Sequence, residues 1–236
     1  MKNVFIILLG LAPFFCLAQT QELTSDLSIK DGKKNEISLF VGMSSYEGDL
    51  HHFDDANLGV ATHAKLAFGL SYKKEINEKL TASISYNNIK IAGDDKMFSA
   101  QSGHVERGFE FTNNLHEISL RMDYLPFGKK SWKLQPFVFA GAGLAFGSAD
   151  VDFNNVAGNP ISDELINDDM ENSKNVTFAL PVGFGAKLEL TRKISLGLEF
   201  GLRLLTNDYL DGVSKAGNSG ANDFYGVGGF TLGYKL

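Results

Sequence analysis

The sequence predicts an all-β fold, an eight-stranded antiparallel up-and-down transmembrane β-barrel. Three observations lead to this prediction. Eight segments alternate apolar and polar residues with a period of two, as half-exposed strands do. The connections between these segments are alternately short and long. An apolar leader precedes them, and no later segment approaches about 18 uninterrupted apolar residues, so the chain would cross a membrane as strands.

Residues 1–18 are predicted to be a cleaved signal peptide. Lys2 supplies the positive charge, residues 4–15 form an apolar run too short to span a bilayer as a helix, and residues 16–18 fit a small-x-small cleavage site. The alternative is a lipoprotein acylated on Cys16, the only cysteine, but Pro13 and two phenylalanines precede it where small residues would be expected. Cleavage after Ala18 is favoured, and it leaves a mature chain without a cysteine for disulfides or metal binding.

The mature chain divides into a flexible lead-in, residues 19–35, and a barrel, residues 36–236. The predicted strands are residues 36–45, 62–74, 79–91, 108–125, 132–147, 177–190, 193–205 and 224–236. The clearest is 193–205, where every even-numbered residue is apolar and the odd-numbered ones from Lys193 to Arg203 are small or charged. Strands of soluble proteins average about 5–6 residues, whereas a tilted transmembrane strand needs about 9–11. The predicted strands have the transmembrane length.

The connections sort into two groups. Three are short, residues 76–78, 126–131 and 191–193, and four are long and polar, residues 46–61, 92–107, 148–175 and 206–223. In an up-and-down barrel every second connection lies at the same rim, and outer-membrane barrels have short periplasmic turns and long outer loops. We therefore expect a protein of the cell outer membrane, exported through the inner membrane by its signal peptide, with both ends of the barrel on the periplasmic side.

The polar strand faces carry charges of both signs: Glu117, Arg121, Asp123, Lys187, Glu189, Glu199 and Arg203. An eight-stranded interior has room only for side chains, so charges inside it must pair. Four acids and three bases nearly balance, and we interpret them as an interior charge network in a barrel whose apolar residues face lipid. The alternative is a soluble barrel of the opposite facing, in which the same charges meet solvent.

No catalytic residue, cofactor site or metal site is predicted. His51 and His52 are adjacent, so their side chains point apart on an extended chain, and the acidic residues of 148–175 lack calcium-loop spacing. Ser44, together with His63, His104 and His116, shows no nucleophile spacing. A net charge of −6 without a basic stripe argues against nucleic acid, and eight strands leave no diffusion channel.

One connection differs from the others, because residues 206–214 mix acids with Tyr, Leu and Val directly after the clearest strand. The simplest interpretation is an ordered loop start with Asx turns; the functional one is a contact patch. The candidate interaction residues are Asp208, Tyr209, Leu210, Asp211, Val213 and Ser214, together with Gly48, Asp49 and Leu50 after the first strand.

These residues also carry a family resemblance. Residues 204–214 resemble the T-D-Y-L-D-D-V-S signature of a family of Bacteroidota outer-membrane barrels that includes the small barrel component of the type IX secretion machinery. Residues 36–50, which end in Y-E-G-D-L, and residues 116–127, 135–146 and 178–187 resemble its other strands in the same order. The signature departs from the family pattern at Asn207 and Gly212.

The resemblance implies a non-catalytic protein whose partners are outer-membrane lipid and a periplasmic ring of lipoproteins. The alternative function is that of a general surface barrel whose long outer loops bind a ligand or a host surface.

Overall fold

Nine β-strands make up most of the part of the chain that the structure describes. The structure is a computed structural model, and it describes residues 35–47, 64–94, 110–128, 133–147, 149–152, 176–206 and 224–236. The strands are β1 (Asn35–Glu47), β2 (Lys65–Glu75), β3 (Leu80–Asp94), β4 (Glu110–Tyr124), β5 (Leu134–Phe146), β6 (Ala149–Asp152), β7 (Thr177–Glu189), β8 (Ile194–Leu205) and β9 (Phe224–Lys235). No helix within these ranges is long and apolar enough to cross a membrane.

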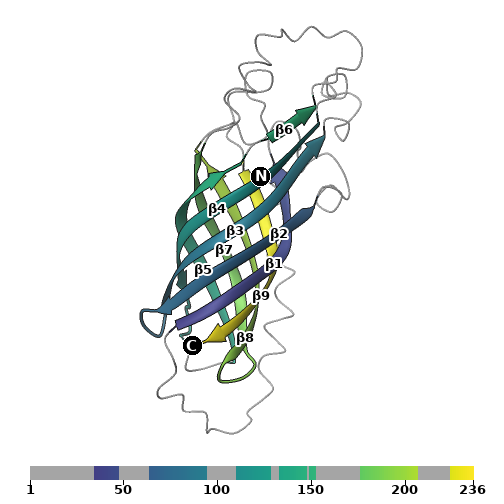
Figure 1. The fold of residues 1–236 in the computed structure, drawn as a ribbon. Helices are drawn as coiled ribbons and strands as arrows, with labels where there is room; N and C mark the ends of the chain where they lie inside the picture. The colour runs from purple at the N-terminus through teal and green to yellow at the C-terminus, as the bar shows by residue number, and fades with distance from the viewer. Residues whose placement is uncertain are drawn as a thin grey trace, which may run out of the picture. The chain divides into compact units, whose positions relative to one another are not determined.

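Eight of these strands form a closed antiparallel barrel (Figure 1). Their order around the wall is β3-β2-β1-β9-β8-β7-β5-β4, and β3 pairs with β4 to close it. The first and last strands pair along their whole length, from Glu36 opposite Lys235 to Glu47 opposite Phe224. The predicted fold class is confirmed, and every predicted segment contains one of the eight strands or most of it.

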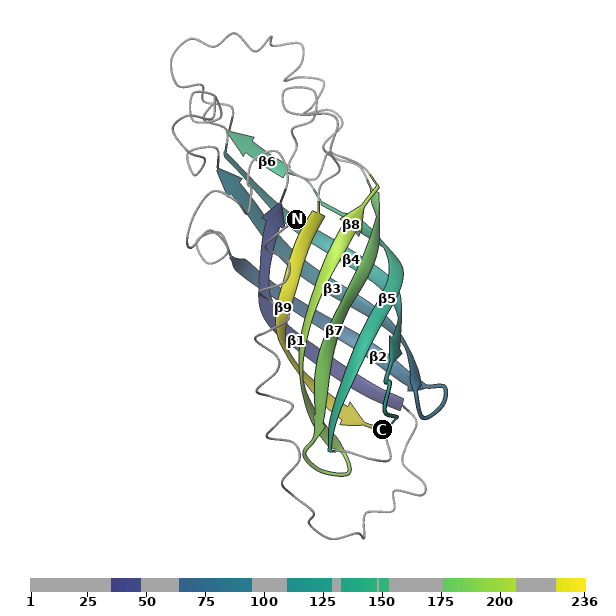
Figure 2. The same ribbon diagram turned by 180° about the vertical axis from the view of Figure 1, so that it is seen from behind.

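β6 was not predicted, because residues 149–152 fall within an expected loop. The reason for the strand lies in β4, which runs beyond the end of β5: β5 pairs with β4 only from His116 to Tyr124. The exposed edge of β4 from Glu110 to Asn113 is paired by β6 instead. Four residues carry too little periodicity to signal a strand. As a result β3, β4 and β6 continue past the other strands at one end of the barrel (Figure 2).

The short connections lie together at the other end, and we call residues 76–79, 125–128 and 190–193 the turn rim. Asn77 Oδ1 accepts hydrogen bonds from the backbone N–H groups of Lys79 (2.8 Å) and Leu80 (2.9 Å). Thr191 Oγ1 accepts from those of Lys193 (3.1 Å) and Ile194 (2.9 Å). Side chains that bond the backbone two and three residues ahead fix tight turns locally. The long connections leave from the opposite end, the loop rim, and most of their residues lie outside the described ranges.

Apolar side chains cover the outside of the wall. On β8 the even-numbered residues from Ile194 to Leu204 are each 38–46% exposed, and on β1 Ile37, Leu39, Val41 and Met43 are 41–54% exposed. The other six barrel strands expose large apolar residues in the same way, and together these residues form what we call the apolar belt. Soluble monomers rarely expose apolar patches beyond about 300–600 Å², so a belt that surrounds the whole barrel predicts contact with lipid.

The belt allows a direct energetic test. Leu198→Arg places a charge in the middle of the outward face of β8 and should lower the free energy of unfolding in lipid vesicles by about 2–4 kcal/mol. Ile194→Arg, on the same strand and face but next to the turn rim, is the matched control and should cost only about 0–1 kcal/mol. If Leu198→Arg were as stable as the wild type, the conclusion that this face of β8 contacts lipid would be wrong.

Candidate functional site

The interior of the barrel is lined by ten charged side chains with little exposure. They are the acids Glu36, Glu117, Asp123, Glu189 and Glu199 and the bases Lys73, Arg121, Lys187, Arg203 and Lys235. All seven charged residues that the sequence analysis assigned to the interior are among them. Five acids and five bases give an electrically neutral set, which is the condition for keeping ionised groups out of water.

A first cluster lies next to the turn rim and joins the two ends of the sheet. Lys187 Nζ lies 2.5 Å from Glu36 Oε2 and 3.6 Å from Glu189 Oε1, and Lys235 Nζ lies 2.5 Å from Glu189 Oε2. Ser195 Oγ donates a further hydrogen bond to Glu36 Oε2 at 3.3 Å. Glu36 and Lys235 belong to the first and last strands, so these contacts through β7 connect the two strands at the seam where the barrel closes.

A second cluster crosses the middle of the lumen. The Arg121 guanidinium donates to Asp123 Oδ1 through Nε at 2.7 Å and to both carboxylate oxygens of Glu199 through its two terminal nitrogens, each at 3.1 Å. Bidentate pairs of this kind are among the strongest hydrogen bonds in proteins. Arg121 is on β4 and Glu199 on β8, which β5 and β7 separate in the sheet. This pair therefore holds opposite sides of the wall together.

Glycines make room for this cluster. The guanidinium of Arg121 lies 4.2 Å from the centre of the Phe139 ring, and the far edge of that ring lies against Gly183 and Gly201. A Cβ atom at either glycine would clash with the ring. Small residues on β7 and β8 thus allow an aromatic ring and a guanidinium to stack inside a narrow barrel.

A third cluster surrounds Glu117, which has no exposed surface. Its Oε2 accepts from Tyr225 OH at 2.7 Å and from Arg203 Nε at 3.3 Å. Its Oε1 accepts from Asn87 Nδ2 at 3.0 Å and from Ser119 Oγ at 3.1 Å. Four donors from β3, β4, β8 and β9 converge on one carboxylate. A buried charge requires such complete hydrogen bonding, because burying a carboxylate without partners would cost a prohibitive free energy.

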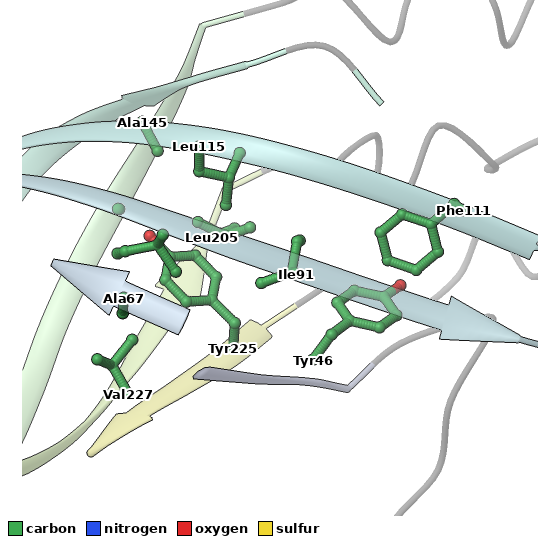
Figure 3. Packing of buried hydrophobic residues seen from close by; sticks show 11 residues of the cluster. Tyr46, Ala67, Ile91, Phe111, Leu115, Ala145, Leu205, Tyr225 and Val227 are labelled. Atoms are coloured by element: carbon green, nitrogen blue, oxygen red, sulfur yellow. The ribbon is translucent and has the colours of Figure 1, made fainter. Parts of the chain in front are cut away.

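The loop-rim half of the interior is mainly apolar, with a few buried polar side chains such as Ser44, Asn113 and Thr177. Tyr46, Ala67, Ile89, Ile91, Phe111, Leu115, Ala145, Ala179, Leu205, Tyr225 and Val227 form one buried cluster, which we call the apolar plug (Figure 3). The rings of Tyr46 and Phe111 meet edge to face at 4.8 Å. Tyr225 joins the plug to the third charged cluster, since its ring packs in the plug and its hydroxyl reaches Glu117.

The space left between these groups is small. A cavity of about 20 Å³ lies among Lys73, Arg121, Glu199, Arg203 and nearby serines. A buried water needs about 10–15 Å³ of this kind of space, so the cavity has room for about one water. With charged clusters on one side and the apolar plug on the other, the described interior is packed, and its arrangement suits rigidity rather than transport.

Comparison with known proteins places the chain in a family. Residues 20–236 match the model described as "Domain of unknown function (DUF6089)". The chain belongs to this family. No curated protein matches it.

Solved structures with a similar chain trace include three outer-membrane or surface barrels. Neisserial surface protein A is 13% identical, with 88% of this chain and 100% of that chain covered and a TM-score of 0.48. Ail of Yersinia pestis is 12% identical (87% and 100% covered, TM-score 0.43), and OprG of Pseudomonas aeruginosa is 12% identical (89% and 99% covered, TM-score 0.42). Similarity at this level carries no argument about the activity or ligand of this chain.

Of the residues weighed as catalytic candidates, the structure places two. Ser44 points inward, is 1% exposed, and its hydroxyl donates to the backbone carbonyls of Lys65 and Lys90. His116 points outward on β4, where its ring lies between those of Tyr86 and Phe146 and its Nδ1 is 2.7 Å from Tyr86 OH. The two therefore lie on opposite sides of the wall. Among the described residues there is no group of three or more potential metal ligands.

The candidate interaction residues lie outside the described ranges. They are Gly48, Asp49, Leu50, Asp208, Tyr209, Leu210, Asp211, Val213 and Ser214. Three charged residues of the interior near strand ends, Glu36, Lys73 and Lys235, were not predicted. Glu36 and Lys73 each adjoin another polar residue, which obscures the alternation. The sequence analysis also missed the apolar plug, although a signal exists: the apolar positions of β3 change from even-numbered (Ile84) to odd-numbered (Ile89, Ile91).

The pairing of the buried Glu117 carboxylate with Arg203 can be tested by substitution. Arg203→Met removes the cation and leaves a buried carboxylate with neutral donors only, so it should lower the free energy of unfolding in vesicles by about 3–5 kcal/mol. Adding Glu117→Gln should recover most of this loss, and Lys193→Met, at an exposed lysine, should change stability by less than about 1 kcal/mol. Strictly additive losses in the double variant would contradict the pairing.

Proposed function

We propose that this chain is a non-catalytic outer-membrane β-barrel that anchors an interaction surface in the membrane and does not conduct solutes. One observation carries the proposal: the wall is apolar on the outside over its full circumference, while the charged groups inside neutralise one another. A protein in water would need the reverse arrangement. A packed interior supports a scaffold, because a diffusion pore of this fold needs more strands.

The orientation follows from the connections. Short turns face the periplasm and long loops face outward in barrels of this class, so the turn rim would lie in the periplasm and the loop rim outside. β1 starts and β9 ends at the turn rim, where Leu236 N donates to Asn35 O at 3.0 Å. A chain delivered through the inner membrane would then begin and finish its barrel on the side from which it arrives.

The more specific proposal is an accessory role in type IX protein secretion, in an organism of the Bacteroidota. It is supported by the resemblance of residues 204–214 to the signature of the family that includes the secretion component. Under this proposal the partners are periplasmic lipoproteins, which would meet the turn rim. The signature residues belong to a connection of the opposite rim, so they would support the barrel rather than form this contact.

Deletion of the coding sequence should impair export of type IX cargo, measured as cargo in the medium against cargo retained in the cell. The wild-type chain should restore export, and Asp208→Ala/Tyr209→Ala/Asp211→Ala should not. Asn218→Ala/Ser219→Ala, in the same connection but outside the signature, is the matched control and should restore it. Normal export in the deletion strain would remove the secretion role.

A second candidate is a surface barrel whose outer loops bind a ligand or a host surface. It is favoured by the continuation of β3, β4 and β6 past the other strands at the loop rim (Figure 2), which gives the loops an ordered base. Replacing residues 95–109 and 153–175 by short linkers should abolish surface binding if the second candidate holds. The deletion strain separates the two candidates, because its cargo export should be impaired under the first and normal under the second.

A further inference from the structure

The edge of the apolar belt at the turn rim carries a row of exposed cations. At this rim, the exposed cations among the described residues are Lys74, Lys79, Lys133, Arg192 and Lys193. They lie at the ends of the outward strand faces. Lys74 follows Tyr72 on the outward face of β2, and Lys79 and Lys133 directly precede the first residues of β3 and β5. Arg192 and Lys193 directly precede Ile194, the first residue of β8. The cations therefore lie where the outer surface of the wall changes from apolar to polar.

Tyrosines mark the same boundary. Tyr72, Tyr124 and Tyr234 point outward near the turn rim and are 41–48% exposed. Tyr72 and Tyr234 are both paired with Ile37, near the start of β1, so they flank the same residue close to the turn rim. Outward aromatic rings at this position are typical of the interface between hydrocarbon and headgroups.

Lys193 shows in which direction a cation at this boundary points. Its Nζ lies 5.9 Å from the centre of the Tyr234 ring, so the ammonium is held back against the wall at tyrosine level. A lysine that served only solubility would extend away from the barrel into water. Held against the ring, the charge lies at the depth of lipid headgroups, as expected for long basic side chains at a membrane edge.

The charge of this boundary is positive. The described residues along this boundary include two acids, Glu78 in a turn and Glu75 at the end of β2, and both already take part in interactions. Against them stand five cations, which leaves a positive surplus. At the loop rim the exposed residues Glu110, Asp150 and Asp152 of β4 and β6 are acidic, and Lys90 of β3 is an exposed cation. Among the described residues the two ends of the wall thus differ in the sign of their net charge.

We propose that the turn rim is a binding surface for the phosphate headgroups of anionic phospholipids in the adjacent leaflet. This inference rests on the proposed membrane-spanning role. Single cations spaced around the circumference at the edge of the belt match a planar layer of headgroups. An acidic protein partner would be met better by cations gathered on one side, so lipid is the occupant that the arrangement favours. Phosphatidylglycerol is a suitable probe, because it adds a net charge to an otherwise similar phospholipid.

The test compares lipids around the reconstituted barrel. In phosphatidylcholine vesicles, spin-labelled phosphatidylglycerol and phosphatidylcholine report by electron spin resonance which lipid is enriched at the protein surface. The wild type should favour the anionic lipid by roughly fivefold, the factor that corresponds to about 1 kcal/mol for one cation near an anionic surface. Lys74→Gln/Arg192→Gln/Lys193→Gln should clearly lower this ratio, because only Lys79 and Lys133 of the five cations remain. Lys90→Gln, an exposed lysine on β3 near the loop rim, is the matched control and should leave the ratio unchanged.

High salt should reduce the wild-type preference at least as far as the triple variant does, since it screens all the exposed charges. This measurement needs no variant and remains available if the triple variant does not insert. The proposed lipid-binding surface would be wrong if the inserted wild-type barrel showed no preference for phosphatidylglycerol, or if the triple variant kept the wild-type preference. Neither result would contradict the proposed membrane barrel. Failure of the wild type to insert would overturn both the surface and the barrel. Capture of an acidic periplasmic protein by the rim, without lipid preference, would also count against the proposal.

Discussion

The narrow lumen of an eight-stranded barrel is the constraint on which the rest of this structure depends. It holds side chains and almost no water, so ionised groups on the inner face must be neutralised by one another. Five acids and five bases meet this condition, and the pairs that matter most cross the lumen: Arg121 reaches Glu199, and Arg203 reaches Glu117. Each of these contacts ties β4 to β8 across the barrel. The charges therefore act as cross-links as well as fillers.

The interior changes character along its axis. Charged clusters occupy the turn-rim half and the centre, and the apolar plug closes the loop-rim half. Tyr225 connects the two regions because it is apolar over its ring and polar at its hydroxyl. The seam between β1 and β9 is stabilised by two ion pairs with β7. Lys187 pairs with Glu36 of β1, and Glu189 pairs with Lys235 of β9. Contacts at the seam, in the centre and in the apolar plug make the barrel a rigid support. Interactions with other molecules would then involve the two rims.

The sequence predicted the strands and their facing because a period of two is a strong local signal. In β8 the alternation from Ile194 to Leu204 identifies both the belt residues and the charged residues Glu199 and Arg203. It could not predict which charges pair, because Glu117 finds Arg203 through the stagger of strands that lie far apart in the chain. β6 was missed since its pairing depends on how far β4 outruns β5, a tertiary property. The apolar plug was missed because an apolar residue on the inner face looks, in one sequence, like a break in the pattern.

The central claim is the inversion of the wall, with apolar residues toward lipid and ionised ones inside, and site-directed spin labelling measures it most directly. Single cysteines at residues 194–205, in a chain whose only native cysteine, Cys16, has been replaced, can be labelled in the reconstituted barrel. Collisions with oxygen, which concentrates in hydrocarbon, should be frequent at the even-numbered positions from 194 to 204, and the odd-numbered positions should be poorly accessible to oxygen and to a water-soluble nickel chelate alike. Ready access of the nickel chelate to the even-numbered positions in mid-strand would contradict the account.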